Sequence, residues 1–248
     1  MSIADRTDVT SLLERLLADR ILIIDGAMGT MIQEHKFEEA DFRGREFADH
    51  GRDLKGCNDL LCVTQPAAIE EIHRKYLEAG ADIIETNSFN SNRLSMLNYG
   101  LENYCRELNQ ASAACARRAA DWMTARTPDR PRFVAGSIGP TDRSASMSRN
   151  VDDPGERNVT YDQLVEAYTE QVAGLVEGGV DILLAETAFD TLNLKACLFA
   201  IAQYFEEHHV RLPVMASVTI FPGGRTLPGQ TLEAFWNSIS HADLLSVG

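Results

Sequence analysis

The chain has 248 residues, of which 44% are hydrophobic and 24% charged, a composition typical of a globular protein with a sizeable core. Its formal net charge of −14 repels phosphate groups, which excludes nucleic acid and anionic membrane surfaces as expected partners. The N-terminus lacks the features of a signal peptide and no apolar run approaches the ~20 residues of a membrane span, so we expect a cytoplasmic protein.

The predicted elements begin with a short amphipathic helix in a segment spanning residues 1–20. Its apolar side consists of Leu12, Leu13, Leu16 and Leu17. A first strand is predicted at Ile21–Ile24, followed by the turn "DGAMGT". This turn does not match the G-x-G-x-x-G pattern, so the sequence gives no support to a dinucleotide-binding fold.

Two later stretches resemble each other: "LEAGADIIETNSF", which starts at Leu77, and "VEGGVDILLAETAFD", which starts at Val176. In each, a helix ends at a glycine, Gly80 or Gly179, where a left-handed cap favours glycine. An aspartate, an apolar run and Glu-Thr follow in both. A helix, a short turn and an apolar strand form the repeating unit of a parallel sheet, and each stretch predicts one such unit.

The remaining elements continue this alternation of helices and strands. A helix is predicted after Thr64 with Pro66 in its first turn, and another over Tyr161–Glu177, where Thr160 and Gln163 form a capping box. Further strands are predicted around Phe133–Ser137, Val214–Thr219 and Leu244–Val247. The sequence therefore predicts six strands.

Alternating helices and parallel strands are compatible with an open doubly wound sheet or with a (β/α)8 TIM-type barrel. Polar residues stand at the carboxyl ends of three predicted strands, where a barrel has its active-site face. They are Asp25, Glu85, Thr86, Asn87, Glu186 and Thr187. We predict an incomplete barrel, with about six of eight strands, over residues 21–248, because ~55 residues separate the first two strands and leave too little length for closure.

The five cysteines form no C-x-x-C pair, and we expect reduced, mostly buried thiols and no metal site among them. They are Cys57, Cys62, Cys105, Cys115 and Cys197.

Several long motifs resemble the N-terminal homocysteine-binding domain of cobalamin-dependent methionine synthases. They are "IDGAMGTMIQ", "DLKGCNDLL", "EAGADIIETNSFNS", "AGSIGPT", "DILLAETAFDTLNLKA" and "GRTLPGQT". The resemblance implies a barrel in which zinc, held by three cysteines, activates the homocysteine thiol for attack on a methyl group. It implies methylcobalamin as the donor, recharged by methyltetrahydrofolate, and implies folate, cobalamin and reactivation modules as partners. The zinc cysteines of that family correspond to positions beyond Gly248, so we expect this chain alone to be inactive.

The same resemblance implies that Asp25 and Gly26 meet the amino and carboxylate groups of homocysteine, and that Glu186 binds its amine. From the residues alone, Asp25 could instead cap the next helix, and Glu186 could pair with a structural arginine or backbone N–H group. Asn87 could contact substrate or fix a loop, and Glu85 is a weaker candidate than these.

Two alternatives to methionine synthase remain open at this stage. One is a stand-alone homocysteine methyltransferase that uses betaine or S-methylmethionine, and the other is a non-catalytic fragment. The insertion "DFRGREFADHGRDLKGCNDLL", residues 41–61, favours the methionine synthase branch.

Overall fold

A computed structural model describes residues 9–148 and 150–248 of the chain. The helices are α1 (Thr10–Asp19), α2 (Met28–Glu34), α3 (Glu39–Arg43), the 3-10 helix η2 (Asn58–Leu60), α4 (Leu61–Thr64), α5 (Pro66–Ala79), α6 (Arg93–Met96), α7 (Cys105–Arg126), α8 (Tyr161–Gly178), α9 (Thr191–His208) and α10 (Leu232–Ile239). The strands are β1 (Ile83–Glu85), β2 (Phe133–Ile138), β3 (Ile182–Ala188), β4 (Val214–Val218) and β5 (Ser246–Val247).

The five strands form one parallel sheet in the order β1-β2-β3-β4-β5, so each strand pairs with the next along the chain. Helices α7, α8, α9 and α10 lie in the successive connections between these strands. Sequential parallel strands joined through helices match the expected α/β architecture and are consistent with part of a TIM-type barrel.

The first of the six predicted strands, Ile21–Ile24, is wrong as a regular strand, because only Ile24 forms a bridge, parallel to Ile83. The segment still runs beside β1, since the backbone N–H of Asp25 donates to the carbonyl of Ile83 over 2.9 Å. The N–H of Ile23 donates instead to the Asp82 carboxylate over 3.0 Å. This side-chain partner interrupts the ladder and leaves one bridge where the sequence predicts a strand.

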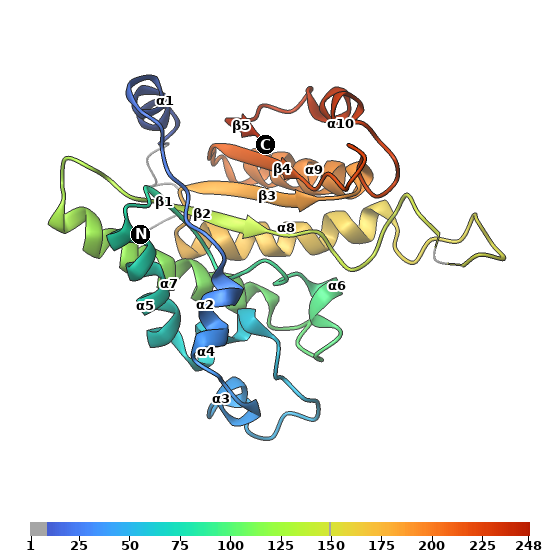
Figure 1. Cartoon of the computed structure of the whole chain (residues 1–248). Coiled ribbons are helices and arrows are strands. Elements are labelled where there is room, and N and C mark those ends of the chain that lie inside the picture. The colour runs from blue at the N-terminus through green and yellow to red at the C-terminus, as the bar shows by residue number, and fades with distance from the viewer. Residues whose placement is uncertain (1–8, 149) are drawn as a thin grey trace.

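The two faces of the sheet pack against different parts of the chain. Residues such as Ile84, Val134 and Leu183 face the largest apolar core, which α7, α8 and α9 complete along one side of the sheet (Figure 1). The opposite face, called the inner face here, carries Ile83, Phe133, Ala135, Ile182 and Leu184. Helix α1 covers part of this face through Leu13, whose side chain is fully buried there.

A separate apolar core lies around the insertion and spans α2, α4, α5 and part of α7, below the sheet in Figure 1. Four of the five cysteines belong to it, and the fifth, Cys197, lies in the core under α9. All five thiols are free and buried, as predicted.

The local signals at helix ends are confirmed. Gly80 and Gly179 follow α5 and α8 with φ angles of 114° and 112°, the left-handed conformation that glycine adopts without strain. Thr160 and Gln163 form the reciprocal capping box at the start of α8. In the part of the chain that the structure describes, no helix is both long and apolar enough to span a bilayer.

Candidate active site at the carboxyl ends of the strands

Side chains alternate between the two faces of each strand, and this alternation places a polar layer on the inner face. On β1, Ile83 faces inward and Ile84 outward, so Glu85 faces inward again. The same alternation turns Ser137 of β2 and Glu186 of β3 toward the inner face. All three stand at or near the carboxyl ends of their strands, directly beyond the apolar inner core.

Asp25 reaches this layer from the segment beside β1. Its two carboxylate oxygens accept the backbone N–H of Glu85, each over 3.1 Å. Helix α2 begins later, with Ala27 at its N-cap and no side-chain cap, so the alternative role of Asp25 as a helix cap is wrong. Burial, together with the negative charge of Glu186, raises the pKa of Asp25 to about 7, while its backbone hydrogen bonds oppose this rise.

Glu186 and Glu85 complete a group of three acids, called the carboxyl layer here together with Asp25. Glu186 accepts a hydrogen bond from the Ser137 hydroxyl over 2.5 Å and another from Thr187 over 3.3 Å. Burial raises the pKa of Glu186 despite these donors. The pKa of Glu85 rises to about 8, first through burial and then through the charges of Glu186 and Asp25.

Gly26 brings the backbone close to an aromatic ring. A Cβ atom at Gly26 would lie 3.2 Å from a ring carbon of Tyr76 and 3.3 Å from its hydroxyl oxygen. The Tyr76 hydroxyl donates to the carbonyl of Ala27 over 3.2 Å, which fixes this turn against α5. The N–H groups of Gly26 and Ala27 donate to no residue that the structure describes, and both residues are exposed. Two adjacent backbone donors therefore stand beside the carboxyl layer.

Asn87 turns toward the neighbourhood of the insertion. Its amide nitrogen donates to the carbonyl of Asn58 over 2.8 Å and lies 3.5 Å from the sulfur of Cys62. These contacts favour the alternative that Asn87 fixes a loop, and its contact with substrate stays a prediction.

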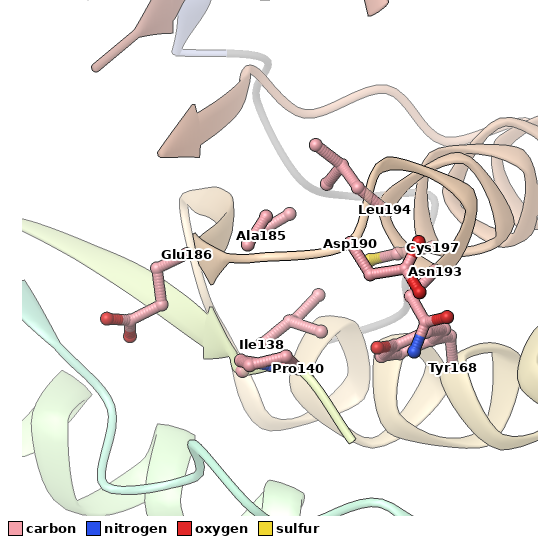
Figure 2. Close-up of a pocket in the computed structure, with 11 residues that line it drawn as sticks. Ile138, Pro140, Tyr168, Ala185, Glu186, Asp190, Asn193, Leu194 and Cys197 are labelled. Atoms are coloured by element: carbon pink, nitrogen blue, oxygen red, sulfur yellow. The ribbon is translucent and has the colours of Figure 1, made fainter. Parts of the chain in front are cut away.

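The pocket in Figure 2 lies on the outer side of the sheet, between β3 and helices α8 and α9. Its volume is about 10 Å³, close to the minimum for one water molecule. Asp190, Asn193 and Tyr168 gather on the helix side, whereas the carboxylate of Glu186 points away from them (Figure 2). Glu186 thus lines this pocket, but its carboxylate is directed to the inner side of the sheet.

The structure gives no support to a metal site within residues 9–148 and 150–248. No three His, Cys, Asp or Glu side chains in these ranges gather closely enough to hold a metal ion. The cysteines lie in the two outer apolar cores, not on the inner face. Cys57, for example, is buried with its sulfur 3.8 Å from the sulfur of Met96. These residues therefore do not fit the zinc ion that the resemblance implies.

Among the predicted site residues, the structure brings Asp25, Gly26 and Glu186 to one region and places Glu85 with them. Glu85 ranked below these residues as a candidate, and Ser137 was not among the predicted site residues. The signal for both was the alternation of side chains along β1 and β2, since inward positions followed from the apolar residues before them.

The fold is an α/β domain whose five-stranded parallel sheet is consistent with part of a TIM-type barrel. The family model described as homocysteine S-methyltransferase matches residues 22–248, and the chain belongs to this family.

Solved structures of the homocysteine methyltransferase MmuM from Escherichia coli have a similar fold. Its metallated form matches with a TM-score of 0.72 and 22% identity, covering 95% of this chain and 76% of that one. Its oxidized form matches with a TM-score of 0.72 and 24% identity, covering 95% and 75%. At this level of identity the likeness establishes the fold, and the family match carries the assignment.

Proposed function

We propose that this chain binds homocysteine at the carboxyl layer and presents its sulfur for methylation. The observation that carries this proposal is the placement of Asp25, Glu85 and Glu186 at one end of the inner face, where no hydrogen bond or ion pair among the described residues joins their carboxyl groups to a cationic side chain. A half-buried group of acids is costly unless a cation neutralises it. The ammonium group of an amino acid is such a cation, and membership of the homocysteine S-methyltransferase family names the amino acid.

The turn after Ile24 and the acid Glu186 then each have a role in binding the amino and carboxylate groups of homocysteine. Asp25 and Glu186 accept hydrogen bonds from the substrate ammonium group, which favours their charged forms. The N–H groups of Gly26 and Ala27 donate to the substrate carboxylate. Ser137 holds the Glu186 carboxylate in place through the hydrogen bond over 2.5 Å. With both polar ends of the substrate fixed, its thiol-bearing side chain is held in one orientation.

Activation of the thiol requires groups other than these. The family resemblance implies zinc for this step, and one solved structure of MmuM is described as metallated. Because the described residues do not fit a zinc ion, we assign to them amino acid binding and positioning, not deprotonation of the sulfur. The prediction that the zinc cysteines lie outside this chain stays open.

We further propose the methionine synthase branch of the family, with methylcobalamin as the methyl donor carried by a separate module. The insertion supports this branch, because it includes the "DLKGCNDLL" motif and contributes η2 and several buried side chains to the apolar core that it shares with α2, α5 and α7. A stand-alone enzyme that uses betaine or S-methylmethionine is the second candidate, because the family match applies to it equally.

Titration calorimetry with L-homocysteine under reducing conditions tests the binding step. We expect Glu186→Gln to weaken homocysteine binding at least about tenfold, since a hydrogen bond to a charged group contributes roughly 1.5–3 kcal/mol. Glu206→Gln is the matched control, because Glu206 is exposed on α9 and lies in the connection between β3 and β4, outside the carboxyl layer. Equal affinities for the two variants, or no binding by the unaltered protein, would contradict the proposal.

A further inference from the structure

We propose that Glu85 is the third carboxyl group of the ammonium subsite, and that it holds a proton in the free protein and releases it when the ligand's ammonium group binds. This inference rests on the proposed function, because it requires a cationic ligand at the carboxyl layer. It adds a residue and a proton-linked step to the binding of the amino acid.

The position of Glu85 follows from the register of the sheet. Its strand lies next to the segment that carries Asp25 and pairs on its other side with β2, which in turn pairs with β3. Glu85 faces inward on this strand and interacts electrostatically with both Asp25 and Glu186. A ligand cation that contacts these two acids therefore lies within the field of Glu85 as well.

Hydrogen bonding distinguishes Glu85 from the other two acids. The Asp25 carboxylate accepts a hydrogen bond from a backbone N–H group, and the Glu186 carboxylate accepts hydrogen bonds from two hydroxyl groups. The Glu85 carboxyl group accepts no hydrogen bond from the residues that the structure describes. A carboxylate without a donor is the least stable of three neighbouring carboxylates, so Glu85 is the group that holds a proton.

Among the residues that the structure describes, no positive charge contributes to the pKa of Glu85 and offsets this effect. The titratable groups facing Glu85 are Asp25 from the adjoining segment and Glu186 from β3. Tyr76 of α5 adds a phenol near Asp25, and burial first and then the negative charge of Asp25 raise the pKa of that phenol. Between them, β2 contributes the neutral Ser137. The pKa of Glu85, raised to about 8, agrees with protonation near neutral pH.

A bound ammonium group reverses this balance. Its positive charge favours the ionised form of each nearby carboxyl group and so lowers the pKa of Glu85. The proton of Glu85 then passes to solvent. By linkage, homocysteine affinity increases as pH rises from about 6 to about 8, by up to about tenfold per pH unit for one released proton.

The first measurement needs no ligand. In protein labelled with carbon-13, we expect the side-chain carboxyl resonance of Glu85, assigned with Glu85→Gln, to titrate with a midpoint near 8. The midpoint should fall in Glu186→Gln, because one like charge is removed. A midpoint near the ~4.3 of an ordinary glutamate would overturn the inference.

The second measurement counts protons by calorimetry of L-homocysteine binding near pH 7 in buffers of different protonation enthalpy. We expect Glu85→Gln to release about one proton fewer than the unaltered protein. At pH 6 the two should bind with similar affinity, and at pH 8 the variant should bind more weakly by roughly several tens of fold, as the release of one proton over two pH units requires. A purely structural role for Glu85 would weaken binding equally at both pH values.

The outcomes separate the two proposals. Homocysteine binding with equal proton release in both proteins would overturn the role of Glu85 and leave the proposed function intact. No homocysteine binding by the unaltered protein would overturn both.

Discussion

Replacing His73 with leucine tests how strongly one buried imidazole limits the stability of this fold. His73 lies in α5, is 0% exposed, and neither of its ring nitrogens has a hydrogen-bond partner in the described part of the chain. Burial lowers the pKa of His73 to about 4, and the nearby charge of Glu70 opposes this only partly. The folded protein therefore keeps this imidazole neutral at a cost.

The magnitude follows from the difference between that pKa and the ~6.5 of an unfolded histidine. As the pH falls below about 6.5 the unfolded chain binds a proton that the folded protein refuses, so the free energy of unfolding decreases. The loss is complete below about pH 4 and amounts to roughly 3 kcal/mol. A neutral imidazole without partners costs a further ~1–3 kcal/mol at any pH.

Urea unfolding followed by circular dichroism measures both effects. We expect His73→Leu to raise the free energy of unfolding by about 1–2 kcal/mol near pH 7.5. The difference in free energy of unfolding between this variant and the unaltered protein should be larger near pH 4.5 than near pH 7.5, by roughly 2–3 kcal/mol. The difference between the two proteins is the informative quantity, because their carboxyl groups titrate alike.

A constant difference from about pH 7.5 to about pH 4.5 would refute the reasoning, since it would mean that folding does not suppress protonation of His73. His241→Gln provides the control, because His241 is exposed and follows α10.

Three other changes should have local effects that unfolding or binding experiments can resolve. Asp82→Asn should lower the free energy of unfolding in urea by roughly 3 kcal/mol, because this fully buried carboxylate pairs with Arg20 and Arg130. Asp243→Asn, in an exposed pair, should lower it by less than about 0.5 kcal/mol. Thr160→Ala should lower the free energy of unfolding by about 1 kcal/mol through loss of the capping box of α8, with unchanged affinity for homocysteine. Gly26→Ala should weaken homocysteine binding several-fold in calorimetry while costing less than about 1 kcal/mol of stability, because its Cβ displaces the Tyr76 ring; an unchanged affinity would show that this turn does not contact the ligand.

The elements that depend on local chemistry could be predicted from the sequence. Gly80 and Gly179 end their helices because only short-range backbone geometry decides a left-handed cap. The apolar strands β2 and β3 were predicted because strands covered on both faces require continuous apolar runs. The repeat of these signals also predicted the parallel architecture.

The features that depend on distant partners could not be predicted in the same way. The segment Ile21–Ile24 has the composition of a strand, but the carboxylate of Asp82, about 60 residues later, takes the N–H group that a ladder would use. The importance of Glu85 depends on which strands flank it and on the direction in which it faces. For Asn87, the sequence could not show that its amide donates to the carbonyl of Asn58, because this contact depends on the path of the insertion.

Only a few residues join helix α1 to the turn at Asp25, and the Arg20–Asp82 ion pair fixes the chain between them to the sheet. The helix that covers the inner core through Leu13 and the proposed ligand-binding residue Asp25 therefore lie on one short segment, which this ion pair fixes near its middle. Detachment of α1 from the sheet would have to break the Arg20–Asp82 ion pair before it displaced Asp25. A strong Arg20–Asp82 ion pair therefore isolates Asp25 from movements of α1. Ligand binding and attachment of α1 should be coupled only to the extent that this ion pair is weak.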